Sequence, residues 1–149
     1  MNTIMKKQSG FTLIELIMVV VILGILSAYA LPRFGEFRYE AEKAAAEGGL
    51  AAVKAASGIV HAQAIIEGKT RSASGESVLM EGMPINLVYG YPSASDIQSA
   101  AGLDGFNVAL AQDSRSVTIS TSKESCKFTF VDSKGPMMRP EISEIECIE

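Results

Sequence analysis

Side chains that could carry out acid-base, nucleophilic or metal chemistry are few in this sequence, and they are scattered. The single histidine, His61, has no second histidine, cysteine or carboxylate at the spacing of a metal-ligand set. The sequence has no G-x-S-x-G nucleophile motif, no glycine-rich phosphate loop, no H-E-x-x-H zinc motif and no CxxC pair. Because an enzyme needs such groups to converge, we expect no catalytic site, no metal site and no cofactor. His61 is predicted to be a helix-surface or interface histidine.

Length and charge narrow the class of protein further. The 149 residues suit one modest domain plus a targeting or anchoring segment. The formal net charge is −4, so the chain lacks the basic surface that binds phosphate backbones, and no nucleic-acid partner is expected.

One carboxylate, Glu15, lies in an otherwise apolar run over residues 11–31. A helix rises ~1.5 Å per residue, so a run of about twenty residues spans roughly 30 Å, the thickness of one bilayer core. The many Leu, Ile and Val side chains offset the cost of about 3 kcal/mol for one acid. Lys6 and Lys7 precede the run, which predicts that the short leader stays in the cytoplasm and the rest lies outside.

Two modes of processing fit this segment and predict different proteins. Ala28-Tyr29-Ala30 has the A-x-A form of a signal-peptidase site, and cleavage there would release a soluble domain from Leu31. Cleavage between Gly10 and Phe11 would instead leave the apolar helix on the mature chain.

The sequence GFTLIEL over residues 10–16, behind a short basic leader, resembles the type IV pilin and pseudopilin family. The resemblance implies that a prepilin peptidase cuts after Gly10 and methylates the new N-terminal Phe11, and that Glu15 is needed for filament assembly. Leaders of the family are often shorter, so translation starts at either Met1 or Met5. The implied organisation is a removed leader at residues 1–10, a transmembrane and assembly helix at 11–33, and a periplasmic or extracellular head at 34–149.

The predicted ammonium of Phe11 is the natural partner for Glu15, because a carboxylate in a low-dielectric helix bundle is tolerated chiefly when it is paired. The partner is either the Phe11 of a neighbouring subunit or the Phe11 of the same chain, at i and i+4. Pairing with a neighbouring subunit would stabilise only the correct axial register, because a misregistered subunit would bury an unpaired charge.

Gly24 and Pro32 lie inside this predicted helix, where they cost roughly 1 and 3 kcal/mol relative to alanine. The resemblance implies that they bracket a stretch which unwinds as the filament forms. The alternative is that lipid and neighbouring helices simply tolerate both residues.

Beyond residue 34, small and apolar residues recur at steps of three and four, which predicts that the helix continues to about Ile66. Residues 68–105 are expected to be irregular apart from a short strand at 85–89. Alternating runs at 106–110, 117–119 and 126–130 predict an antiparallel meander. The helix is expected to cover its apolar face, giving an α+β fold similar to the pilin fold. The predicted apolar stripe consists of Phe34, Phe37, Ala41, Ala44, Gly48, Ala51, Ala55, Ile59 and Ala62.

Cys126 and Cys147 lie beyond an exported segment, which predicts a disulfide bond in an oxidising compartment; a chance pair of reduced thiols is the alternative. The bond would tie the C-terminal tail to the last predicted strand. By resemblance to pilins this bridged segment is exposed, and Met137, Met138 and Arg139 are a candidate contact patch, with loop packing as the alternative.

Residues 49–69 (GLAAVKAASGIVHAQAIIEGK) and 88–108 (VYGYPSASDIQSAAGLDGFNV) resemble pilins of the mannose-sensitive haemagglutinin (MSHA) branch. The resemblances imply a single-pass inner-membrane precursor that polymerises into an extracellular filament for surface attachment and twitching-type motility. The implied partners are other copies of the chain, the prepilin peptidase, an assembly ATPase, an inner-membrane platform and an outer-membrane secretin. The main alternative is a type II secretion pseudopilin, for which Asp104, Asp113 and Asp132 leave a calcium site open.

Overall fold

The computed structural model describes residues 10–148, and its contacts divide the chain into two units between Arg38 and Tyr39. Each unit is described by itself. The predicted leader, residues 1–10, lies outside the described residues except for Gly10, and so do both candidate start positions, Met1 and Met5.

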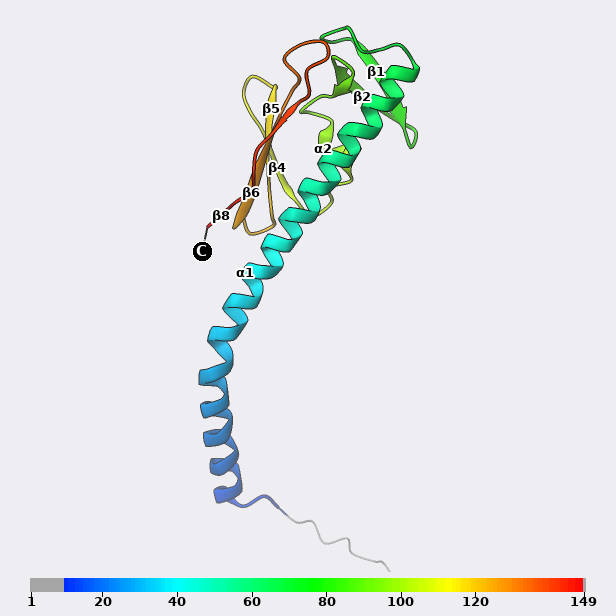
Figure 1. The fold of residues 1–149 in the computed structure, drawn as a ribbon. Helices are drawn as coiled ribbons and strands as arrows, with labels where there is room; N and C mark the ends of the chain where they lie inside the picture. Colours follow the sequence, from blue (N-terminus) through cyan, green and yellow to red (C-terminus); the bar gives the residue numbers. More distant parts are fainter. Residues whose placement is uncertain (1–9, 149) are drawn as a thin grey trace, which may run out of the picture. The chain divides into compact units, whose positions relative to one another are not determined.

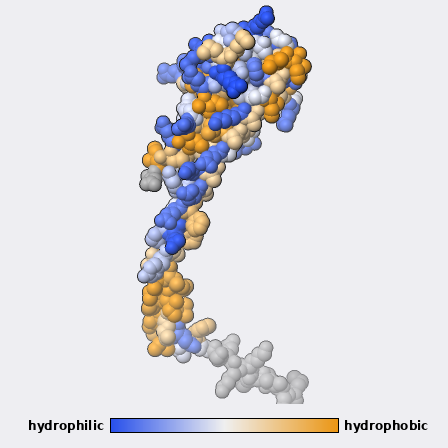
Figure 2. All heavy atoms as spheres, viewed as in Figure 1, coloured by the Kyte–Doolittle hydropathy of each residue, from blue (hydrophilic) through white to orange (hydrophobic). Residues whose placement is uncertain are grey.

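Helix α1 spans Leu13–Ile66 and is unbroken, passing through Gly24 and Pro32. In the first unit its large apolar side chains are exposed on all sides, and Figure 2 shows this stretch as a hydrophobic surface. By length and composition, α1 contains one segment apolar enough to cross a membrane, and that segment has no buried residue within the chain.

The part of α1 in the second unit, residues 39–66, buries a face made of small and β-branched side chains. This face differs from the predicted stripe, whose members are all exposed; that part of the prediction was wrong. The segment is rich in Ala and Gly on every side, so steps of three and four can be traced along two faces, and the bulkier Val53 and Val60 mark the buried one. The buried residues are Ala46, Gly49, Val53, Ala56, Ser57, Val60 and Ala64.

The helix ends where the sequence predicts, at Ile66. Gly68 adopts a left-handed conformation with φ of 72°, and the N–H of Lys69 donates to the carbonyl of Ala64 at 2.8 Å. This is the hydrogen bonding of a glycine-terminated helix, which satisfies carbonyls that the last turn leaves free.

The predicted antiparallel meander is confirmed. Strands β4 (Asn107–Leu110), β5 (Ser116–Ser120) and β6 (Cys126–Val131) pair in sequence order, and β6 also pairs with β7 (Glu141–Ile142) and β8 (Glu146–Cys147). Figure 1 shows β4, β5 and β6 beside one another next to α1.

The predicted disulfide bond is present between Cys126 and Cys147, which are direct partners in the β6–β8 pairing. The bond closes a loop with a sequence separation of 21 residues. The C-terminal tail is therefore held against the sheet by both backbone pairing and a covalent link.

Residues 68–105 are more ordered than predicted. They form a second antiparallel sheet of β1 (Glu76–Met80), β2 (Met83–Val88) and β3 (Tyr91–Pro92), followed by the short helix α2 (Ile97–Ala101). The β1–β2 hairpin turns at Glu81 and Gly82, whose φ angles are 49° and 83°. Two positive φ angles are the geometry of the tight turn that matches strand twist. The turn was not predicted from the sequence, because its first position holds a glutamate in place of the usual Asn or Asp.

Two clusters of buried side chains hold these layers together. Val60 and Ala64 of α1 pack with Val78 of β1 and with Ile85 and Leu87 of β2. The second cluster joins Val53 of α1, residues of the α2 region, and the inner faces of β5 and β6. Its buried members are Val53, Ala94, Ile97, Leu103, Val117, Ile119, Phe128 and Phe130.

A buried hydrogen bond links the two sheets. The carboxylate of Asp132, just after β6, accepts the N–H of Ala94, just after β3, at 2.6 Å. Asp132 is only 6% exposed, and its burial raises the pKa of its carboxyl group above the ordinary value, against the lowering effects of the Ala94 bond and of Arg115. The nearby Asp113 raises the pKa further.

Two adjacent glycines of α1 provide a test of this packing. A Cβ added at Gly49 would lie 2.7 Å from the Phe106 ring, whereas one added at Gly48 would meet nothing within 4 Å. Both alanine variants gain about 1 kcal/mol of helix propensity. Overpacking costs about 1–3 kcal/mol, so Gly49→Ala should be less stable than Gly48→Ala by about that amount. Denaturant unfolding of the detergent-solubilised chain measures the difference; equal stabilities would show that the Phe106 ring yields freely.

The buried carboxyl predicts a pH dependence. A folded-state pKa above the unfolded value means that the native state binds the proton of Asp132 more tightly than the unfolded state does. Protonation of Asp132 therefore adds to the free energy of unfolding. This contribution is complete below the unfolded pKa and is lost as pH rises through the folded pKa. Asp132→Asn cannot titrate. The unfolding free energy of the wild type minus that of Asp132→Asn should therefore fall as pH rises from about 3.8. A difference that rises with pH would mean that the Ala94 hydrogen bond outweighs burial.

Candidate functional site

The predicted cleavage site lies at the entrance to α1. Gly10, Phe11 and Thr12 are exposed and not helical, and α1 begins at Leu13. The side chain of Phe11 is 93% exposed. The Gly10–Phe11 peptide bond is therefore accessible, and its backbone needs no unwinding before a peptidase can bind it.

Thr12 and Glu15 form a reciprocal cap on this helix end. One carboxylate oxygen of Glu15 accepts the N–H of Thr12 at 2.9 Å and the hydroxyl of Thr12 at 2.8 Å. The N–H of Glu15 lies 3.3 Å from the Thr12 hydroxyl oxygen, which accepts it. This is the capping-box arrangement, in which side chains satisfy N–H groups that have no partner within the helix.

The capping box gives Glu15 a local role that the sequence reading missed. The signal was present, because Thr-x-x-Glu before an apolar run is the pattern of such a cap. The pairing of Glu15 with a Phe11 ammonium stays a prediction.

Gly24 and Pro32 are both helical in this structure, and α1 is continuous between them. Pro32 has no N–H to donate to the Ala28 carbonyl, but the helix continues on both sides of it. Unwinding of this stretch during assembly stays a prediction.

The three acids left open as calcium ligands, Asp104, Asp113 and Asp132, do not converge. Asp132 accepts the Ala94 N–H, and Asp113 accepts the N–H of Arg115 at 3.1 Å. Neither these acids nor Asp104 belongs to a cluster of three or more potential metal ligands within residues 10–148.

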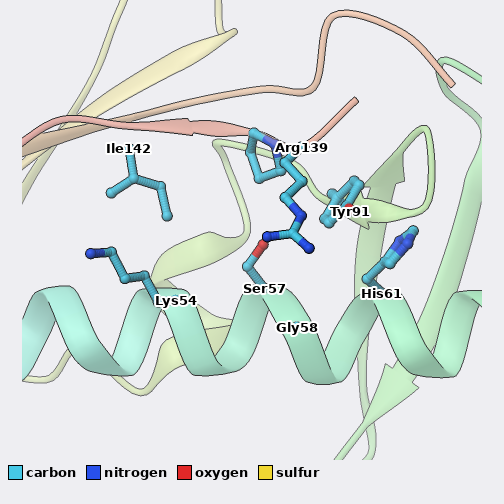
Figure 3. Close-up of a pocket in the computed structure, with 8 residues that line it drawn as sticks. Lys54, Ser57, Gly58, His61, Tyr91, Arg139 and Ile142 are labelled. Atoms are coloured by element: carbon cyan, nitrogen blue, oxygen red, sulfur yellow. The ribbon is translucent and has the colours of Figure 1, made fainter. Parts of the chain in front are cut away.

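His61 is packed within the head rather than free on the surface. Its ring stacks on that of Tyr91 with a centroid distance of 3.9 Å, and its Nδ1 lies 3.0 Å from the carbonyl oxygen of Gly90 (Figure 3). His61 thus joins α1 to the β2–β3 turn. This agrees with the predicted interface histidine.

The tail residues proposed as a contact patch are exposed. Met137 is 99% exposed, and Met138 and Arg139 are also exposed. Exposure is what a contact patch requires, but the contact itself stays a prediction.

Comparison with known proteins identifies the N-terminal segment. Residues 5–31 match the prokaryotic N-terminal methylation motif. The chain is 47% identical over 73 residues to the type IV major alpha-pilin of Moraxella bovis, covering 49% of this chain and 43% of that protein. It is 43% identical over 65 residues to a fimbrial protein of Pseudomonas aeruginosa, covering 44% and 40%. These findings support the type IV pilin family.

The likeness to these pilins extends over only part of each chain. The matched region covers less than half the length of these two curated relatives. A pseudopilin is also similar: the type II secretion system core protein G of Pseudomonas aeruginosa is 47% identical over 51 residues, 34% of this chain and 36% of that protein. No solved structure matches the chain. The MSHA branch stays a prediction.

The capping box predicts a measurable change at the pilin-like N-terminus. Thr12→Val keeps the shape of the side chain but removes the hydroxyl that both donates to and accepts from Glu15, at a cost of about 1 kcal/mol. The Glu15 amide should then exchange its hydrogen about fivefold faster in detergent micelles. Thr12→Ser keeps the hydroxyl and is the matched control. Equal exchange in both variants would show that the cap does not hold the helix end in solution.

Proposed function

We propose that this chain is the major structural subunit of a type IV pilus. It is made as a precursor, cleaved between Gly10 and Phe11, N-methylated on Phe11, and polymerised through the apolar part of α1. The observation that carries the proposal is the methylation motif at residues 5–31, which lies where the backbone is exposed directly before a membrane-length apolar helix.

The structure favours this processing over the release of a soluble domain. Ala28-Tyr29-Ala30, the alternative site, lies in the interior of α1, so a signal peptidase would have to unwind the helix to bind there. Gly10 and Phe11 need no such change. The proposed mature chain keeps the apolar helix, with residues 11–33 as the membrane and assembly segment and 34–149 as the head.

The proposed life cycle follows from the apolar helix. The precursor spans the inner membrane once, with its leader in the cytoplasm, and leaves it for an extracellular filament of identical subunits. A prepilin peptidase, an assembly ATPase, an inner-membrane platform and an outer-membrane secretin are the proposed partners. Surface attachment and twitching-type motility are the proposed uses of the filament, and an MSHA-type pilus is the proposed branch.

A second candidate is a major pseudopilin of a type II secretion system. The likeness to core protein G favours it, because the two chains are 47% identical over 51 residues. The Cys126–Cys147 bond, by resemblance to pilins, favours the pilus.

The mature N-terminus decides the processing step. Intact mass and N-terminal sequencing of the protein from its native host should give a chain that begins at Phe11 with one added methyl group. The mass should rise by two hydrogen atoms on reduction, because one disulfide bond opens. A chain that begins at Leu31 would contradict the proposal.

A companion variant separates processing from assembly. Glu15→Ala should still yield methylated Phe11, but filaments sheared from the cell surface should be absent. Thr12→Ser is the matched control and should assemble. Normal surface filaments in Glu15→Ala would overturn the assembly role, and wild-type protein that never appears in sheared surface filaments would favour the pseudopilin.

A further inference from the structure

The head contains a groove between α1, the β2–β3 turn and the C-terminal tail. Two hollows of about 540 Å³ and 690 Å³ form it, and they share His61, Tyr91 and Arg139 in their walls. Volumes of this size are typical of small-ligand sites, whereas contacts between proteins are broader and flatter. Because the hollows share a wall, together they suit a ligand longer than one ring.

The groove collects positive charge on a chain that is acidic as a whole. Lys54 and Arg139 line the first hollow, and Arg71 and Arg139 line the second. No Asp or Glu lines either hollow within the described part of the chain. The ion pairs of residues 10–148 are Lys69–Glu67, Lys127–Glu146 and Lys134–Glu141, so none of the three groove cations is neutralised by a carboxylate.

Hydroxyl and aromatic groups complete the lining. Figure 3 shows the guanidinium of Arg139 reaching from the tail toward the hydroxyl of Ser57 on α1, with Lys54 one turn earlier on the same helix. Tyr91 and His61 stack beside them. Thr70 and Tyr89 add further hydroxyl groups in the second hollow.

We propose that this groove binds an acidic oligosaccharide, whose uronate carboxylates are held by Arg139 and by Lys54. A guanidinium presents a planar fork of donors that matches a carboxylate, and hydrogen bonds between charged groups are about twice as strong as neutral ones. Neighbouring cations with no acid among them focus the field on an incoming anion. The hydroxyl groups of Ser57, Thr70 and Tyr89 both donate and accept, as sugar hydroxyls require.

All residues that line the groove belong to the second unit of a single chain, so binding can be tested on the unassembled full chain. The chain is solubilised in a neutral polyoxyethylene detergent, which carries neither charge nor sugar. Trigalacturonate is titrated by calorimetry at low salt, and its fully methyl-esterified form is the matched neutral ligand. The acid should bind, the ester should bind at least tenfold more weakly, and raising the salt should weaken binding of the acid.

Variants locate the site. Arg139→Gln should weaken binding of trigalacturonate about tenfold or more, and Lys54→Gln should weaken it by a smaller factor. Lys123→Gln, which removes an exposed cation outside both hollows, is the control and should bind as the wild type does. Since all three side chains are exposed, their thermal midpoints should match that of the wild type.

Two results would overturn the proposal. Equal binding of acid and ester, or unchanged binding in Arg139→Gln, would mean that the groove cations do not recognise the carboxylate. Failure of trigalacturonate to bind, together with self-association that Arg139→Gln abolishes, would assign the groove to a second copy of the chain.

Discussion

The large apolar surface of α1 in the first unit is the constraint on which the proposed role of this molecule depends. More than a dozen large apolar side chains between Phe11 and Leu31 have no cover within the chain. Burying one such side chain is worth about 1.5–3 kcal/mol, so leaving all of them in water would forgo tens of kcal/mol. That exceeds the whole stability of an ordinary domain, about 5–15 kcal/mol. Lipid or other copies of the helix must therefore cover this surface, and a chain that passes from membrane to filament exchanges one cover for the other.

In the second unit, by contrast, one face of α1 is covered by the rest of its own chain. Its buried face is made of Ala, Gly, Ser and Val, which lets two small sheets approach the helix closely. Gly49 is the tightest point, since it faces the Phe106 ring. The Ala94–Asp132 hydrogen bond then joins the two sheets, and the Cys126–Cys147 bond holds the C-terminal tail to β6. Small residues thus set the packing distance, and a few specific links fix the order of the layers.

The sequence predicted features that depend on strong local signals. The end of α1 could be predicted because Gly68 follows a long helical pattern. Strands β4, β5 and β6 could be predicted because their apolar residues alternate. The buried face of α1 was not, since Ala and Gly give little contrast between faces. The β1–β2 hairpin was missed because Glu81-Gly82 is a weak turn signal. The groove could not be predicted because Lys54, Tyr91 and Arg139 are far apart in the sequence and line the same hollow only in the folded chain.

The capping box changes how the charge on Glu15 is understood. A lone carboxylate in an apolar helix would be costly to bury, but here Thr12 already supplies two hydrogen bonds to it. Both donors belong to Thr12 and not to the Gly10–Phe11 bond, so proposed cleavage after Gly10 would leave them in place. A Phe11 ammonium formed by the proposed cleavage would add an ionic partner to these hydrogen bonds. The carboxylate would keep its position beside Thr12 when that partner is added, and a fixed carboxylate is what the proposed register role of Glu15 requires.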